Sequence, residues 1–246
     1  ESVTVGGTTV ALDVKAGPYL RVAGTGIALT IAGQTLRGSV SVEQEATKTH
    51  VVLADASLRL GDGTTDLVVL SEGSGSFVLT GGATPAMTGS LSVTVALNVP
   101  SVSLGGTVRL EIDTAANSLR IGGTDVQLSV AGQTLSGTLW ITQSGPAGAR
   151  VTTISASGVR LFLGDAGSAS TTDDDRGLQV TDGHGSLLLT RAGLATQLAG
   201  TVELVGLDDT GLVLGATDVA LAVNTTTSPV KDAGLGLDLP AGRFLR

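Results

Sequence analysis

The chain has 246 residues, of which 41% are hydrophobic, 15% charged and 2% aromatic, and it contains 36 glycines and no cysteine. This composition is too apolar for intrinsic disorder, and a chain without cysteine has no disulfide framework, thiol nucleophile or cysteine-ligated metal site. The formal net charge of −8 repels nucleic acid and anionic lipid headgroups, which bind lysine- and arginine-rich surfaces.

Strand-like alternation begins near residue 20. Val40 and Val42 alternate with Ser39 and Ser41, which predicts a half-buried β-strand. The apolar positions change parity at residues 24–26, Gly-Thr-Gly. We therefore expect a glycine-rich bend there that turns the chain while one face stays inward.

Such a Gly-x-Gly corner recurs along the chain. It is found again at residues 73–75 and 183–185, and as Gly-Thr-Asp at residues 123–125, with spacings of 49, 50 and 60. A period near 50 is typical of solenoids, propellers and stacked arrays. Together with the alternation, it predicts about 20 short strands separated by bends and no helix.

Residues 20–44 align without gaps to residues 119–143, with 12 identities in 25. In this alignment Trp140 takes the place of Ser41, between Leu139 and Ile141, which match the inward Val40 and Val42. The tryptophan is therefore expected on the outer face and not in the core.

Two further residues follow the same rule. Arg160 and Phe162 alternate with Leu161 and Leu163, so both are expected to face outward. Exposed aromatic side chains mark contacts between chains or sugar-stacking sites. Trp140, Phe162 and Arg160 are therefore the candidate interface residues, against the alternative that these aromatics are isolated or covered by a neighbouring loop.

Acidic residues gather in an insertion that the first repeat lacks. Asp173, Asp174 and Asp175 are consecutive, and Asp165 is nearby, with a second acidic pair at residues 208–209. Carboxylates in a flexible loop suit Ca²⁺, so the first four are candidate metal ligands. The alternative is a solvated acidic loop, because neither a glycine-rich nonapeptide nor an EF-hand pattern is found.

The sequence contains no recognisable set of catalytic residues. His184 occupies the middle of a Gly-x-Gly corner, where other copies carry Thr25 and Ser74, so we read it as a turn residue despite the nearby Asp182. No nucleophile elbow accompanies it, and we expect the protein not to be an enzyme. Residues 224–226, Asn-Thr-Thr, form a formal glycosylation sequon.

The last ten residues begin a third copy, since residues 237–246 match residues 12–21. We therefore expect a segment of a longer array, cut within a repeat. The expected divisions are the tail of a preceding repeat (1–19), a first repeat (20–118), a second repeat with insertions (119–244) and the start of a following repeat (245–246).

These features favour an all-β protein in which an elongated β-solenoid-like or stacked-sheet array buries its small aliphatic residues only between neighbouring modules. Tandem β-sandwich domains are the main alternative, since they would explain a repeat of about 100 residues, but they usually keep a buried aromatic residue. A propeller or another closed form is the third possibility.

Residues 16–36 (AGPYLRVAGTGIALTIAGQTL) and 95–108 (VALNVPSVSLGGTV) resemble the tandem repeats of very large bacterial surface-associated or exported proteins. The resemblance implies an extracellular or cell-surface, extended polypeptide with structural, adhesive or filament-forming work. We expect a structural module of a long fibre, with no required cofactor, whose partners are further repeats or neighbouring copies and neither nucleic acid nor a membrane interior. The alternative is a calcium-assisted adhesin that binds a glycan or a partner surface.

Overall fold

The computed structural model describes residues 2–5, 8–11, 19–31, 34–61, 66–99, 102–130, 133–146, 148–165, 175–207, 214–242 and 244–245. These residues form strands, turns and bends, with no helix among them.

The long strands are β3 (Tyr19–Ile31), β4 (Gln34–Glu45), β5 (Lys48–Gly61), β6 (Asp66–Thr80), β7 (Ala86–Val99), β8 (Val102–Asp113), β9 (Ser118–Val130), β10 (Gln133–Ser144), β11 (Val151–Asp165), β12 (Arg176–Thr190), β13 (Gly193–Val205) and β14 (Gly215–Asn224). The short ones are β1 (Ser2–Val5), β2 (Thr8–Ala11), β15 (Val230–Asp232), β16 (Leu237–Leu239) and β17 (Phe244–Leu245).

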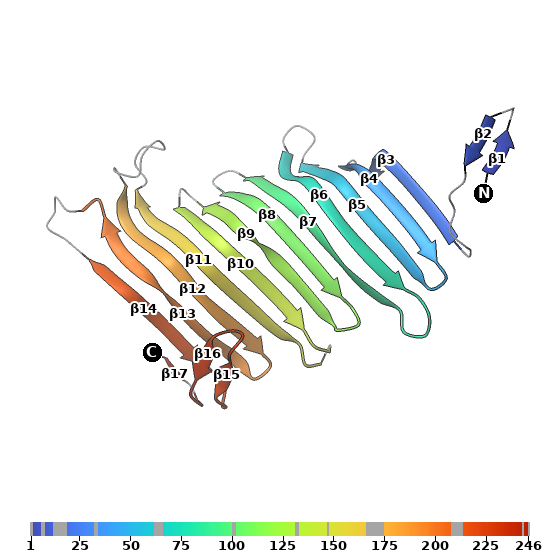
Figure 1. Cartoon of the computed structure of the whole chain (residues 1–246). Helices are drawn as coiled ribbons and strands as arrows, with labels where there is room; N and C mark the ends of the chain where they lie inside the picture. Colours follow the sequence, from blue (N-terminus) through green and yellow to red (C-terminus); the bar gives the residue numbers. More distant parts are fainter. Residues whose placement is uncertain are drawn as a thin grey trace.

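One open sheet contains all the long strands. Each strand from β3 to β14 pairs antiparallel with the next in the chain, and β17 pairs with β14 at the far edge (Figure 1). The expected all-β, elongated sheet array is thus confirmed, and it takes the form of one continuous antiparallel sheet. The strands of both sequence repeats lie in this single sheet, so they do not form two separate sandwiches.

The two copies of the sequence repeat have the same pairing. In the hairpin β3–β4, Leu20 lies opposite Gln44 and Ile31 opposite Gln34. In β9–β10, the equivalent Leu119 lies opposite Gln143 and Val130 opposite Gln133. One repeat of the sequence motif therefore builds one hairpin with a fixed register.

The Gly-x-Gly segments are not bends between short strands, as the sequence suggested, but β-bulges inside long ones. Gly24 pairs with Val40 and Ile27 with Gly38, so the pairing advances three residues in β3 and two in β4. A bulge adds one residue to one strand without ending the ladder. This explains why the parity of the apolar positions changes while the same face is kept.

Many of the bulges contain a residue whose backbone dihedral angles lie in the left-handed region. Gly26 has φ of 62°, and the equivalent residue of the second repeat, Asp125, has φ of 54°. Glycine adopts this conformation freely, and aspartate more readily than most other residues. Others in the same region are Asp55, Glu72, Gly158, Asp182 and Asp218. The bulges of β3, β5, β6, β9, β11, β12 and β14 therefore form a band across the sheet.

Register assigns the side chains to two chemically different faces. In β8, Val108, Leu110 and Ile112 lie on one face, and Arg109 and Glu111 on the other. We call the first the aliphatic face and the second the polar face throughout the sheet. Among paired residues with described side chains in β3–β14, the charged residues on the aliphatic face are Asp165 and Arg176, which lie opposite each other at one end of β11 and β12.

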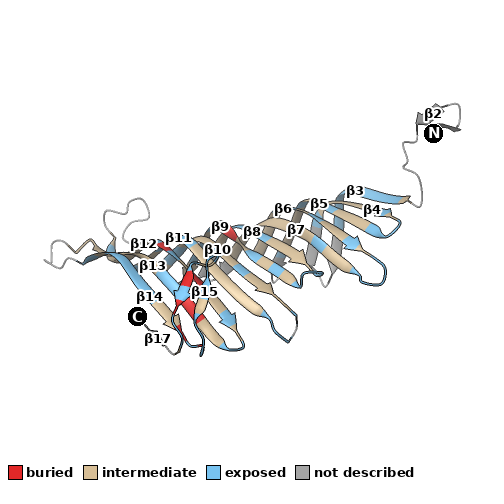
Figure 2. Ribbon diagram, turned by 60° about the horizontal axis from the view of Figure 1, so that its bottom comes forward, coloured by how far each residue is buried: buried red, intermediate tan, exposed pale blue. Residues whose placement is uncertain are grey.

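The described part of the chain has one small buried cluster, and it lies on the polar face. The hairpin β15–β16 places Leu237 and Leu239, 3% and 2% exposed, against the fully buried Ala195 of β13. Burial is greatest at this corner of the sheet (Figure 2). The rest of the sheet is a single layer whose residues are mostly half-buried or exposed.

Asn224, at the end of β14, holds this hairpin in place. Its Nδ2 donates hydrogen bonds to the backbone oxygens of Ser228 (3.0 Å) and Pro240 (2.7 Å). Its Oδ1 accepts hydrogen bonds from the backbone N–H (2.9 Å) and the hydroxyl (2.8 Å) of Thr226. The side chain is fully buried, and its amide is engaged in the fold, so the sequon is not accessible for glycosylation in the folded chain.

The left-handed residue of the β9 bulge gives a direct test of this backbone. The variant Asp125→Val should lower the free energy of unfolding by at least about 1 kcal/mol, because a β-branched residue is disfavoured at positive φ. The variant Asp125→Gly should cause no loss. Denaturant unfolding measures both, with Thr124→Val as a control that should stay within about 0.5 kcal/mol of the parent. An Asp125→Val chain as stable as Asp125→Gly would contradict the bulge geometry.

Candidate functional site

Trp140 lies in a charged cluster on the polar face. The guanidinium carbon of Arg120, on the neighbouring strand β9, is 3.8 Å from the centroid of the indole ring. Arg120 Nη1 also lies 3.2 Å from Glu111 Oε2, and Arg109 Nε lies 2.8 Å from Glu111 Oε1. The cluster therefore links three adjacent strands, β8, β9 and β10, through two ion pairs and one cation–π contact.

Register places Trp140 on the opposite face from Leu139 and Ile141, as the alternation predicted. The tryptophan is half-buried, whereas both neighbours are 37% exposed. Arg120 covers one side of the ring. A sugar or partner can stack on that side only if the arginine moves away.

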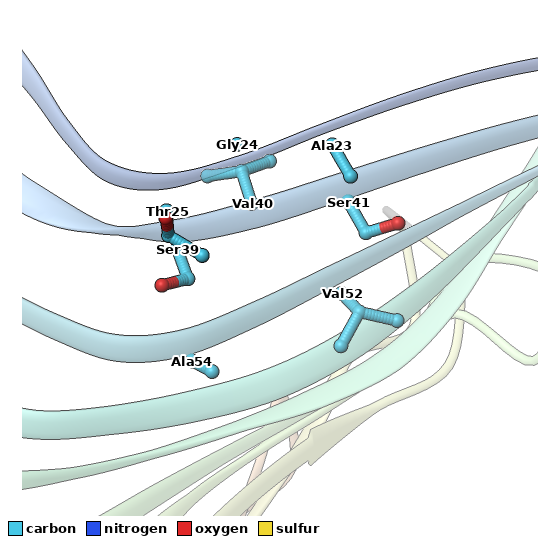
Figure 3. A pocket seen from close by; sticks show the side chains of 8 residues that line it. All are labelled: Ala23, Gly24, Thr25, Ser39, Val40, Ser41, Val52 and Ala54. Carbon is cyan, nitrogen blue, oxygen red and sulfur yellow. The ribbon is translucent and has the colours of Figure 1, made fainter. Parts of the chain in front are cut away.

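The first repeat has a hollow where the second has the indole. Ser41, the equivalent of Trp140, lies with Ala23, Val52 and other small residues around a hollow of about 390 Å³ (Figure 3). In the second repeat the residue that pairs with Trp140 is Gly122, in place of Ala23. A Cβ atom at Gly122 would lie 2.7 Å from Trp140 Cα, so the glycine accommodates the close approach of the tryptophan strand.

Phe162 and Arg160 share the polar face with Trp140 but lie far from it. Phe162 pairs with Thr134 and Arg160 with Ser136, whereas Trp140 pairs with Ser155. Six residues of strand separate Thr134 from Trp140, which corresponds to about 20 Å. The structure therefore does not join the two aromatic residues into one patch.

The candidate metal ligands are only partly described. Asp173 and Asp174, like residues 208–209, lie outside the described residues. Asp165 is exposed and lies opposite Arg176 in the register, and Asp175 is half-buried just before β12. Within the described ranges, no group of three or more histidine, aspartate or glutamate residues is arranged to hold a metal ion.

His184 lies on the exposed part of β12, inside its bulge. Its Nδ1 is 2.7 Å from the backbone oxygen of Asp182. The sequence predicted a turn residue, but His184 lies within β12 and pairs with Ala199. The hydrogen-bond partner of its Nδ1 is a main-chain carbonyl and not the carboxylate that orients a catalytic histidine.

The exposure of the aliphatic face is the surface feature that sequence reasoning misjudged. The sequence predicted that these side chains point inward against neighbouring modules, yet in the described structure nothing covers them. Fifteen large aliphatic side chains on this face are at least 36% exposed, among them Val22, Ile121 and Leu189. Alternation reveals which residues share a face, but it carries no signal of what lies against that face.

A second hollow, of about 310 Å³, lies on the aliphatic face along the bulge band. The residues that line it include the small Gly137, Ala156 and Gly183 and the leucines Leu139 and Leu198. The small residues lower the surface locally, so the aliphatic face has both depressions and protruding leucines.

Comparison of the chain with protein-family models, with curated proteins and with solved structures gave no match. Among the described residues there is no helix of the length and apolarity needed to cross a membrane.

The cation–π contact can be tested with the single tryptophan as the reporter. Arg120→Ala should lower the free energy of unfolding by about 0.5–1 kcal/mol. It should also increase acrylamide quenching of Trp140 and shift the emission to longer wavelength, because water replaces the guanidinium. Arg109→Ala, which removes an ion pair but no ring contact, should leave the emission unchanged. Equal quenching in the two variants would contradict the assigned contact.

Removal of divalent ions provides a test of the acidic insertion. The insertion lies between β11 and β12, and the equivalent strands of the first repeat, β5 and β6, pair in the same register without it. Excess chelator should therefore change the melting temperature by less than about 2 °C, well below the effect of losing a structural metal. A fall of tens of degrees, reversed by Ca²⁺, would show that the insertion binds a structural ion.

Proposed function

We propose that the chain is a structural module of a long extracellular fibre-like surface protein, in which successive repeats extend one antiparallel sheet. The observation that carries this proposal is the pairing of β17. Phe244 and Leu245 pair with Asn224 and Val223 of β14, and they match Tyr19 and Leu20, the first residues of β3, in the sequence repeat.

This match indicates how a further repeat would extend the sheet. The segment that follows β14 adds to the sheet edge at the same sequence position at which β3 and β9 begin. A further repeat would then lengthen the sheet by strand addition, which uses only backbone hydrogen bonds and needs no new interface. The partners in this proposal are further repeats and neighbouring copies.

A length measurement tests the growth rule. In a chain with residues 20–118 duplicated directly before Leu119, six strands, β3–β8, are added to the sheet. At about 4.8 Å for each strand, the particle should lengthen by about 29 Å along the stacking direction with an unchanged cross-section. Small-angle scattering and negative-stain images measure both dimensions.

A suitable control is a duplication of the same length with the residues of 20–118 in scrambled order, which should add disordered chain and not a defined length. If the true duplication forms two separate compact bodies, or a particle that grows equally in all directions, the sheet does not propagate and the proposed function is wrong.

A further inference from the structure

The exposed aliphatic face is a large apolar surface that nothing in the described structure covers. Soluble monomers rarely expose a continuous apolar patch larger than a few hundred Å². Here the side chains of one sheet face are mostly aliphatic, from Val22 on β3 to Leu221 on β14, which are 59% and 42% exposed. The polar side chains on this face include Gln44, Thr49 and Gln143 near the strand ends. Within the described sheet, the small hairpin β15–β16 packs on the polar face and leaves this face open.

The chain exposes more surface than a compact monomer of the same mass. The chain exposes 15463 Å², whereas a compact monomer of 24.3 kDa exposes about 10,000 Å². The excess is about 5,400 Å². This excess is per chain and comes from both faces of the single layer. Obligate homodimer interfaces bury about 2,000–5,000 Å² in total, about half of it on each chain, so covering one face of the sheet would supply the area that a permanent dimer needs.

We propose that two copies of the chain pack through their aliphatic faces and form a two-layered β-sandwich around a two-fold axis. In such an interface the same patch serves both subunits. Two sheets pack about 10 Å apart with their strands about 30° from parallel, and their inner faces consist of interdigitating aliphatic side chains. The face described here has this composition, with the charged residues Asp165 and Arg176 confined to one end.

Charge placement is compatible with a second copy on the aliphatic face. Both copies carry a formal net charge of −8 and would repel each other in an arbitrary orientation. In the face-to-face arrangement, Glu43, Glu111 and Glu203 lie on the outward polar faces. The repelling carboxylates are then separated by two sheet layers and solvated on the outside.

The shape of the aliphatic face, with a hollow bordered by leucines, also suits a partner surface made of aliphatic side chains. The hollow of about 310 Å³ at Gly137 and Gly183 is lined mainly by apolar residues, among them Leu135 and Leu198, and also by Thr138 and His184. Leucine or isoleucine side chains of a facing sheet can enter such a depression, and the bordering leucines can fill the equivalent depression of the partner. A flat apolar sheet would lack this means of setting the alignment.

Two adjacent residues of β10 offer a matched test of the pairing. Ile141 lies on the aliphatic face directly opposite Ile121, and Thr142 lies on the polar face opposite Arg120. The parent chain should sediment as a dimer at micromolar concentration. Ile141→Lys should raise the dimer dissociation constant at least 100-fold, because each dimer would bury two unpaired ammonium groups. Thr142→Lys should leave the dimer intact.

A labelling experiment decides the matter if Ile141→Lys fails to fold. Since the chain has no cysteine, single cysteines can be placed at 141 and 142. In the dimer, Ile141→Cys should react with a maleimide at least tenfold more slowly than Thr142→Cys. Equal reactivity of the two cysteines, or a monomeric parent chain at 100 µM, would overturn the proposal.

Acyl chains are the other class of apolar cover, and the same samples distinguish them. A parent chain that is monomeric in buffer but floats with phosphatidylcholine vesicles, with Ile141→Cys protected only when vesicles are present, would show that lipid covers the face and that the pairing is wrong. The duplication experiment measures length along the sheet and not thickness. Failure of the pairing and failure of sheet growth therefore give different results.

Discussion

The backbone hydrogen bonds between consecutive strands are the interaction on which this structure depends. In the described sheet every strand from β3 to β14 pairs with its neighbours in the chain, and the buried side-chain cluster is confined to one corner. The ladder fixes the register, the register separates an aliphatic face from a polar face, and both the proposed growth and the proposed pairing follow from that separation. A one-residue slip would exchange the two faces, so the hydrophobic pattern in turn specifies the register.

Much of this arrangement was predictable from the residues. The alternation of Val40 and Val42 with Ser39 and Ser41 revealed strands and their faces, and the match of residues 20–44 to 119–143 predicted two equivalent units. What failed was the length of the strands. A glycine pair and a parity change have the same sequence signature in a bend and in a bulge, and the difference depends on whether the neighbouring strand continues past that point.

The same limit applies to the surface. The position of Trp140 followed from alignment with Ser41, but its contact with Arg120 depends on which strands are adjacent, and the compensating change from Ala23 to Gly122 gains meaning only when the register is known. Similarly, no sequence pattern distinguishes an aliphatic face covered by its own chain from one left for another molecule. That distinction depends on tertiary arrangement, which local periodicity does not encode.

The up-and-down order of the strands also determines how the sheet would respond to force. The first long strand, β3, and the short β17 lie at opposite edges of the sheet. Tension between them would act across the strands and would load the hydrogen bonds of one edge a few at a time. Such a sheet yields by peeling, one strand after another, and each detached strand releases a length of slack chain while the remaining ladder stays paired. Under load, a module of this kind would extend in small steps, each of which dissipates work, and re-pairing with the adjacent strand would restore it when the load falls.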